Sequence, residues 1–229
     1  MADRNDSSAP GIAALRASDP VMARLIDSLE PVDLGRWRAR WSLDPFRSLA
    51  RAIVGQQIAN VAANAIFGRL QTLIGDRDPA AAIAAASDEE LRAVGLSANK
   101  AASLRDLAAR TLDGRLDLDR LDDMTDDEAR AQLTAVRGIG AWTADLFLLG
   151  QLGRPDILPA GDLGIRHAIR AADGLDHVPS EGEVRARSAA WSPHRSLATA
   201  YLYSSLRAAG PPPREGPGQR GRGRPTRGG

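Results

Sequence analysis

Helical periodicity recurs along almost the whole chain, and several of its stretches begin at residues that typically cap helices. Asp44-Pro45 opens an apolar stripe that continues past Gly55 to Leu70. Ser87 with Glu90, and Thr125 with Glu128, have the spacing of capping boxes. We find no convincing strand pattern, so the sequence predicts an all-α fold.

A break at Gly55-Gln56-Gln57 is expected to divide the stripe into two helices. The other expected helices cover residues 20–29, 78–86, 97–111, 126–136, 141–152, 163–172, 180–190 and 193–209, with one more that begins after Ser87. So many short helices favour two helical lobes over one simple bundle.

The chain has 229 residues, of which 43% are apolar, enough for a substantial core. We expect a flexible N-terminus over 1–15, a folded body over 16–209 and a disordered tail over 210–229, rich in Gly, Pro and Arg. The tail carries a net charge of +4 and the rest of the chain −3. The tail is either a solubilising segment or a basic arm for nucleic acid.

Composition excludes several kinds of site. The chain has no cysteine, so it can hold neither a disulfide nor a thiolate metal site, and three scattered histidines make a histidine metal site unexpected. It has no apolar run of spanning length and no signal sequence, so we expect a cytoplasmic protein that does not enter a membrane.

The most informative stretch is 133–144, LTAVRGIGAWTA. It predicts a helix end, a tight turn at Gly138-Ile139-Gly140 and a new helix from Ala141. Two glycines permit backbone angles that other residues resist, and Ile139 can bury and anchor the turn. Amides in such a turn, beside a helix N-terminus, bind phosphate. The alternative is a plain turn between two helices with a glycine cap.

With its context, this stretch resembles the helix-hairpin-helix DNA glycosylase superfamily and, within it, the DNA-3-methyladenine glycosylase II type. The resemblance covers roughly residues 20–208, and Asp162 stands twenty-two residues beyond Gly140, the spacing typical of the family. The segments that carry it are Asp44-Pro-Phe46 with Ile53-Val-Gly-Gln-Gln57, Val94-Gly-Leu-Ser97 with Lys100, Val136 to Ala144, Pro159-Ala-Gly-Asp162-Leu-Gly164 and Trp191 to Ala198.

The resemblance implies an active site in the cleft between the lobes, with Asp162 as the catalytic carboxylate. Asp162 can also cap the helix that follows it, and the two roles are compatible. Asp156 competes for the role, but its spacing does not match. An alkylated purine already carries positive charge and leaves as a neutral base, so one carboxylate suffices and no acid is needed.

A cationic base favours an aromatic pocket, for which Trp142 is the first candidate and His194 and Tyr203 are weaker ones. Trp142 can instead be a packing residue, and we expect Trp41 and Trp191 in the core or at the lobe junction.

The enzyme must flip its target nucleotide, and the resemblance implies Gln57 or Ile58 as the wedge that fills the gap. The alternative is a helix break with a solvent-facing Gln. The expected DNA contacts are Arg137, Gly138, Ile139, Gly140, Thr143 and Lys100. Lys100 can equally be a solvated surface residue.

The family resemblance implies a monofunctional glycosylase that excises alkylated purines from double-stranded DNA in base excision repair. We expect a monomer that requires no cofactor, although a monovalent cation could bind at the hairpin, at Gly138 and Gly140. Few residues precede Asp44, so an N-terminal β-rich domain of the best-known bacterial members is missing or reduced, and His194 replaces an expected aromatic.

Three alternatives remain open. One is a glycosylase for deaminated or oxidised bases, and another is a non-catalytic helix-hairpin-helix DNA-binding protein. The third is an RNA-binding protein that acts through its Arg/Gly tail.

Overall fold

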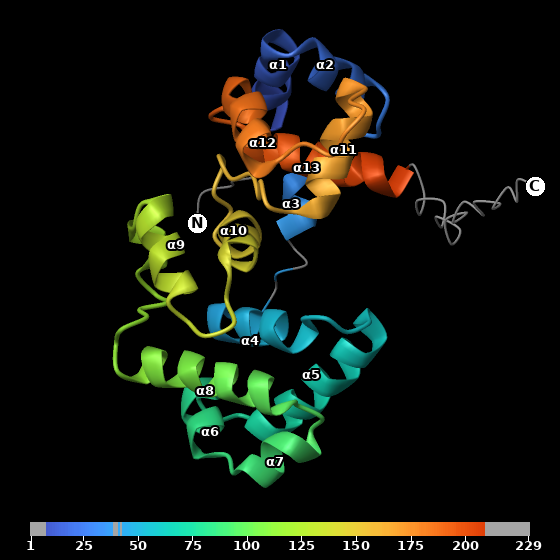
Figure 1. The fold of residues 1–229 in the computed structure, drawn as a ribbon. Helices are drawn as coiled ribbons and strands as arrows, with labels where there is room; N and C mark the ends of the chain where they lie inside the picture. The colour runs from blue at the N-terminus through green and yellow to red at the C-terminus, as the bar shows by residue number, and fades with distance from the viewer. Residues whose placement is uncertain (1–7, 39–40, 42, 209–229) are drawn as a thin grey trace, which may run out of the picture.

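A computed structural model of the protein describes residues 8–38, 41 and 43–208. These residues form helices and no strand (Figure 1), which confirms the all-α prediction. The helices are α1 Ser8–Ser18, α2 Pro20–Asp27, α3 Leu34–Arg38, α4 Pro45–Gly55, α5 Asn60–Ile74, α6 Pro79–Ala85, α7 Asp88–Ala93, α8 Ala98–Leu112, α9 Asp126–Thr134, α10 Ala141–Gly150, α11 Leu163–Asp173, α12 Glu181–Arg187 and α13 Arg195–Ala208, with 3-10 turns η2 Leu121–Asp123 and η3 Ser188–Trp191.

Capping residues start these helices where the sequence predicts. The Asp44 side chain accepts a hydrogen bond from Arg47 N at 2.9 Å, directly before Pro45 in the first turn of α4. Ser87 with Glu90 and Thr125 with Glu128 form complete capping boxes at α7 and α9. Local side-chain chemistry therefore sets these helix starts.

The structure adds two helices that the sequence analysis did not expect. Helix α1 occupies residues 8–18, so residues 8–15 of the expected flexible N-terminus are helical, and Leu15 is buried. Helix α3, only five residues long, lies between α2 and α4. The first seven residues and the expected tail over 210–229 lie outside the described residues.

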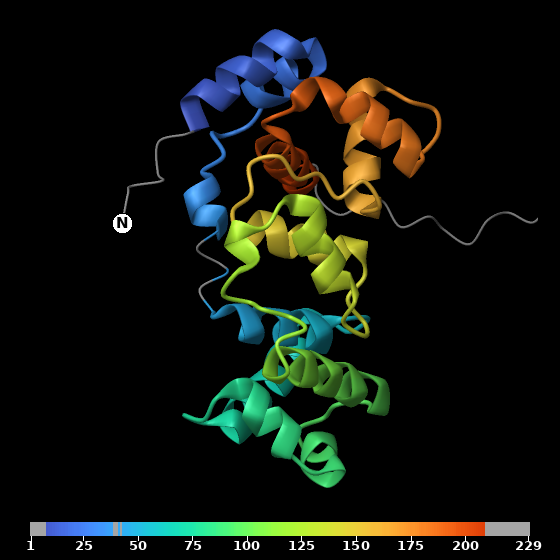
Figure 2. The same cartoon turned by 90° about the vertical axis from the view of Figure 1, so that its left-hand side faces the viewer.

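Two separate hydrophobic cores divide the chain into two lobes, as the sequence predicts. The larger core belongs to a central lobe of α4–α10 and the segment up to Ile157. The smaller belongs to a terminal lobe built from α1–α3 and α11–α13 with η3. Both views place α10 between the two groups of helices (Figures 1 and 2). The central lobe is thus an insertion between the two parts of the terminal lobe.

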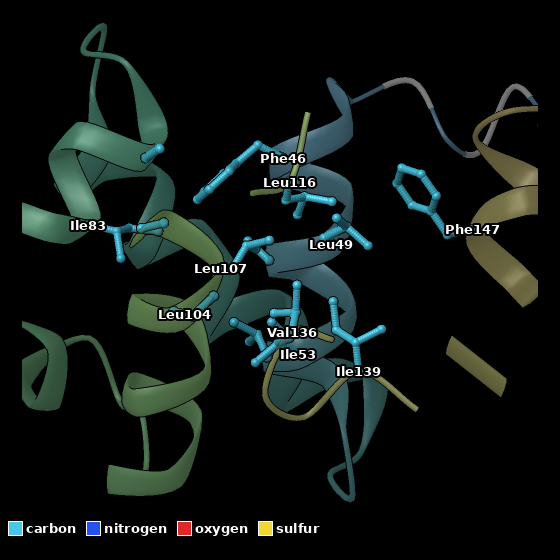
Figure 3. Packing of buried hydrophobic residues seen from close by; sticks show 14 of the residues in the cluster. Phe46, Leu49, Ile53, Ile83, Leu104, Leu107, Leu116, Val136, Ile139 and Phe147 are labelled. Atoms are coloured by element: carbon cyan, nitrogen blue, oxygen red, sulfur yellow. The ribbon is translucent and has the colours of Figure 1, made fainter. Parts of the chain in front are cut away.

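The central core reaches the Gly138 turn. Val136 and Ile139, on either side of Arg137-Gly138, are buried beside Ile53 of α4 (Figure 3). Ile139 is only 4% exposed, so its side chain anchors the turn and leaves only its backbone for contacts outside. The packing of α4 therefore fixes the position of the turn.

Candidate active site

The turn between α9 and α10 needs glycine at one of its two glycine positions. Gly138 has φ +79°, and a Cβ there would lie 2.7 Å from Ser103 Oγ on α8. Gly140 has φ −91°, and a Cβ there would meet open space. The expectation that both glycines have angles that other residues resist is therefore wrong for Gly140.

Helix α8 holds this turn in place. Arg137 N donates a 2.7 Å hydrogen bond to Asp106 Oδ2, and the Arg137 side chain remains exposed. Burial acts to raise the pKa of Asp106, but hydrogen bonds from Arg137 N and the Arg110 side chain outweigh it and lower the pKa. No side chain caps the N-terminus of α10 at Gly140. The turn therefore presents a rigid helix N-terminus in which the amides lack a side-chain partner.

The turn between α4 and α5 lies next to it. Gln57 is exposed and has φ +57°, the only positive φ of a non-glycine residue among those described. The break is where the sequence predicts it, but Gln57 rather than Gly55 takes the left-handed conformation. Gln56 Nε2 donates a 2.7 Å hydrogen bond to Gly138 O and so joins the two turns. Ile58 is half-buried.

Lys100 of α8 is half-buried and contacts α4. Its Nζ donates a 2.7 Å hydrogen bond to Val54 O, near the C-terminus of α4. Burial lowers the pKa of its ammonium group. Lys100 is therefore not merely solvated, and its role as a DNA contact stays a prediction.

Asp162 lies where the two lobes meet. Its Oδ1 accepts a hydrogen bond from Ile165 N at 2.8 Å and caps α11, and its Oδ2 accepts one from Trp142 Nε1 of α10 at 2.5 Å. A Cβ on Gly164 would lie 2.9 Å from Asp162 Oδ1, so that glycine leaves room for the carboxylate. Asp162 is therefore both a helix cap and half of a polar contact between the lobes.

Tyr203 of α13 belongs to the same cluster. Burial raises the pKa of its phenol, and the neighbouring Asp162 carboxylate raises it further. Tyr203 therefore stays protonated beside a half-buried Asp162. The structure brings Asp162, Trp142 and Tyr203 together, and the role of Tyr203 in a base pocket stays a prediction.

Trp142 is 47% exposed and borders two cavities. One, of about 640 Å³, lies against the turn between α4 and α5 and is lined by Trp41, Leu43, Ser48, Arg51, Ala52, Gly55, Gln56, Gln57, Asn60, Ala63, Trp142, Thr143 and Leu146. Thr143 is buried in its wall, so the structure does not place it on an outer DNA-contacting surface. The other, of about 690 Å³, has walls from both lobes that carry paired charges, among them Arg130 with Asp145.

Of the two other candidates, His194 lies away from both cavities, whereas Asp156 lines the 690 Å³ cavity but is already paired with Arg195. His194 packs against α1, where a Cβ on Gly11 would lie 3.2 Å from His194 Nδ1, and it lines neither cavity beside Trp142. The expectation that His194 belongs to the base pocket is therefore corrected. Asp156 accepts two 2.8 Å hydrogen bonds from the Arg195 guanidinium and one from Ser192 Oγ. This pairing makes Asp156 a structural carboxylate.

The sequence analysis missed three residues of the site. Trp41 was expected in the core or at the lobe junction, yet it lines the 640 Å³ cavity, and its ring occupies the space over Gly150. Gln56 was treated only as part of a helix break. Gly164 appeared only within a motif, although its lack of a side chain accommodates Asp162. The sequence offered one signal, for Trp41: Gly150 leaves room for its ring. That signal can be recognised only once the fold brings the two residues together.

The described ranges contain no group of His, Asp or Glu side chains that could hold a metal ion. Within the same ranges, no helix is long and apolar enough to cross a bilayer.

Comparisons with known proteins place this geometry in a family. The model of the HhH-GPD superfamily of base excision DNA repair proteins matches residues 50–194. DNA-3-methyladenine glycosylase 1 of Schizosaccharomyces pombe is 32% identical over 182 residues, which are 77% of this chain and 80% of that protein.

Two solved structures share the fold. A DNA-3-methyladenine glycosidase from Bacillus halodurans has a TM-score of 0.75 and 30% identity, over 92% of this chain and 93% of the other. A 3-methyladenine DNA glycosylase from Schizosaccharomyces pombe in complex with abasic DNA has a TM-score of 0.70 and 30% identity, over 86% and 97%.

Proposed function

Because the chain belongs to the HhH-GPD superfamily of base excision DNA repair proteins, we propose that it is a monofunctional DNA glycosylase that excises alkylated purines. The proposed enzyme is of the DNA-3-methyladenine glycosylase II type. The observation that carries the proposal is the contact between Asp162 and Trp142, which sets a carboxylate against an aromatic ring at the lobe boundary.

The chemistry requires a fixed negative charge near the sugar. An alkylated purine leaves as a neutral base, so the developing positive charge on the sugar is what needs stabilising. Asp162 Oδ1 accepts a hydrogen bond from Ile165 N and Oδ2 one from Trp142 Nε1, and Tyr203 lies beside the same carboxylate. A carboxylate has about four acceptor sites, so it retains one for a water molecule or the sugar. Asp162 thus stabilises the oxocarbenium-like sugar and orients the attacking water.

The 640 Å³ cavity beside Trp142 is the pocket for the flipped base. Its volume lies within the range of small-molecule sites, and Trp41 and Trp142 offer it aromatic surface. An electron-rich ring attracts a cationic base through its π-face. The pocket therefore favours a purine that carries the positive charge of alkylation.

The DNA partner is a duplex held by the turn between α9 and α10. The uncapped N-terminus of α10 at Gly140 suits a backbone phosphate, and Gln57 is the wedge that replaces the flipped base. The protein acts as a monomer in the cytoplasm and requires no cofactor. A monovalent cation at the hairpin would share Gly138 O with the Gln56 amide, whereas Gly140 O carries only the α10 helix bond from Ala144 N.

A second candidate substrate is a deaminated base with an added carbonyl group. Arg51 lines the same cavity, and its guanidinium, which bonds Asn64 Oδ1 at 2.8 Å, keeps further donors for a carbonyl oxygen. A nearby cation also disfavours a cationic base. The identity of the released bases decides between the two substrates.

The test is release of bases from methylated duplex DNA, with each base identified by chromatography, by the wild-type protein and by Asp162→Asn. The amide oxygen can still cap α11, but the amide carries no charge and its NH2 group faces the Trp142 Nε1 donor. We therefore expect a loss of about a hundred- to thousandfold in rate with only a small fall in melting temperature. Release of hypoxanthine from a deaminated duplex, without release of methylated bases, would favour the second candidate. Binding without release by the wild-type protein would identify a non-catalytic DNA-binding protein.

A further inference from the structure

The turn between α4 and α5 has a conformation that its own sequence does not favour. Gln57 has φ +57°, in the left-handed region that residues with a side chain rarely occupy. Such a residue keeps this conformation only where its surroundings hold it. The relevant contacts are therefore those of the residues next to Gln57.

Two hydrogen bonds to other elements hold this turn on the N-terminal side of Gln57. Before it, Lys100 Nζ of α8 donates to Val54 O at 2.7 Å, which fixes the last turn of α4. Within it, Gln56 Nε2 donates to Gly138 O at 2.7 Å, across eighty-two residues of sequence. Both donors are side chains, so a substitution at position 56 or 100 removes each contact without changing residues 57–59.

The Gln56 contact joins this turn to a part of the molecule that is itself rigid. Gly138 packs against Ser103, and Arg137 N bonds to Asp106 Oδ2. Ile139 is buried in the central core. The distance from Gln57 to the amides at the start of α10 is therefore set by contacts already made without DNA.

Lys100 suits its position for a physical reason. The chain contains twenty-nine arginines and this single lysine. An ammonium is a compact charge, and here it meets one carbonyl near the C-terminus of α4, the negative end of a helix dipole. A planar guanidinium with its five donors is less suited to a single carbonyl in a partly buried space.

We propose that Gln56 and Lys100 are positioning residues that lock the turn at 55–59, so that Gln57 meets the duplex already in the shape in which it replaces a flipped base. The inference rests on the proposed glycosylase function. A locked wedge matters only where a base stack must be opened, because a single strand offers no partner strand and little stacking to disrupt. The lock therefore affects excision from duplex DNA more than excision from single strands.

The test compares release of one alkylated purine from matched duplex and single-stranded oligonucleotides under single-turnover conditions. Gln56→Glu keeps the side-chain size but loses the donor, and Lys100→Met keeps the length but loses the ammonium. Arg69→Met is the matched control, because Arg69 Nε also donates to a backbone carbonyl of another element, Val94 O at 2.9 Å, in the same lobe.

We expect the ratio of the duplex rate to the single-strand rate to fall about five- to tenfold in Gln56→Glu and Lys100→Met, the effect of one lost hydrogen bond. Arg69→Met should leave the ratio unchanged. Both rates come from one preparation, so an unfolded fraction cancels in the ratio.

The outcomes separate the lock from the glycosylase function. If the wild-type protein releases no base from either oligonucleotide, the proposed function fails and the lock fails with it. If the wild type is active and both variants retain its ratio, the lock alone is overturned. An equal fall in both rates also overturns it, because that result indicates a general structural role.

Discussion

Gly138 and Gly140 stand two residues apart, but their substitution should have opposite consequences. Gly138→Ala places a Cβ 2.7 Å from Ser103 Oγ at a positive φ, so we expect a loss of stability of about 1–3 kcal/mol. Gly140→Ala meets open space and should melt like the wild type, but its methyl group obstructs a phosphate that approaches the start of α10. Thermal melting and DNA-binding titrations of both variants check this prediction. A Gly140→Ala protein with wild-type affinity would show that DNA does not approach this turn closely.

We expect the protein to release a base without cutting the DNA strand. A glycosylase that also cuts the strand needs an amine that attacks the sugar, and Lys100 is the only lysine in the chain. Its Nζ is engaged with Val54 O, and arginine stays protonated, so borohydride should trap no covalent adduct with DNA that contains an abasic site. The measurement is an adduct band on a denaturing gel, beside Lys100→Met. A strong band that Lys100→Met abolishes would make Lys100 a nucleophile.

At the scale of elements, a buried ion pair ties α2 to α12 and η3. Asp19 caps α2 and accepts hydrogen bonds from Trp191 Nε1, at 2.6 Å, and from Arg187, which also pairs with Asp173. Burial acts to raise the pKa of Asp19, but Arg187 and Trp191 outweigh it and lower the pKa to about 2. A lowered pKa stabilises the fold above the unfolded-state pKa, near 4, and this contribution disappears as the pH falls towards 2.

Asp19→Asn should therefore lower the free energy of unfolding at pH 7, by about 2–4 kcal/mol, because it leaves Arg187 with one carboxylate partner. The loss should shrink between pH 4 and pH 2, where the wild type loses the same charge. Urea unfolding across this range measures it. Asp27→Asn is the control, since Asp27 pairs with Arg16 on the surface and should change stability little. Equal losses in the two variants at pH 7 would refute the role of the buried pair.

The sequence predicts the starts of several helices but not the contacts between distant elements. Helix starts depend on neighbours within a few residues, so the caps at Asp44, Ser87 and Thr125 were found. Helix α1 carries little apolar periodicity and depends on Leu15 packing in the terminal lobe, so it was missed. The contacts of the site depend on residues far apart in sequence, such as Gln56 with Gly138, and no local pattern encodes such pairs.

At the scale of the whole molecule, charge is divided unevenly along the chain. Residues 210–229 carry +4, and the remaining 209 residues carry −3. Deletion of residues 210–229 should therefore weaken binding to undamaged DNA and flatten its dependence on salt, because fewer counterions are released. Base release at saturating enzyme should be unchanged. Fluorescence anisotropy at several salt concentrations gives the slope, and an unchanged slope would exclude the tail from DNA binding.

The insertion of the central lobe between the two parts of the terminal lobe has a consequence during synthesis on the ribosome. Helices α1 and α2 leave the exit tunnel first, but their partners α11 and α13 are made last (Figures 1 and 2). At typical elongation rates they wait on the order of ten seconds or more, while the central lobe can already close around its own core. Asp162 and Trp142 come from different lobes, so their contact forms only when the nascent chain is nearly complete. The order of translation thus makes the contact between Asp162 and Trp142 one of the last events in the maturation of the protein.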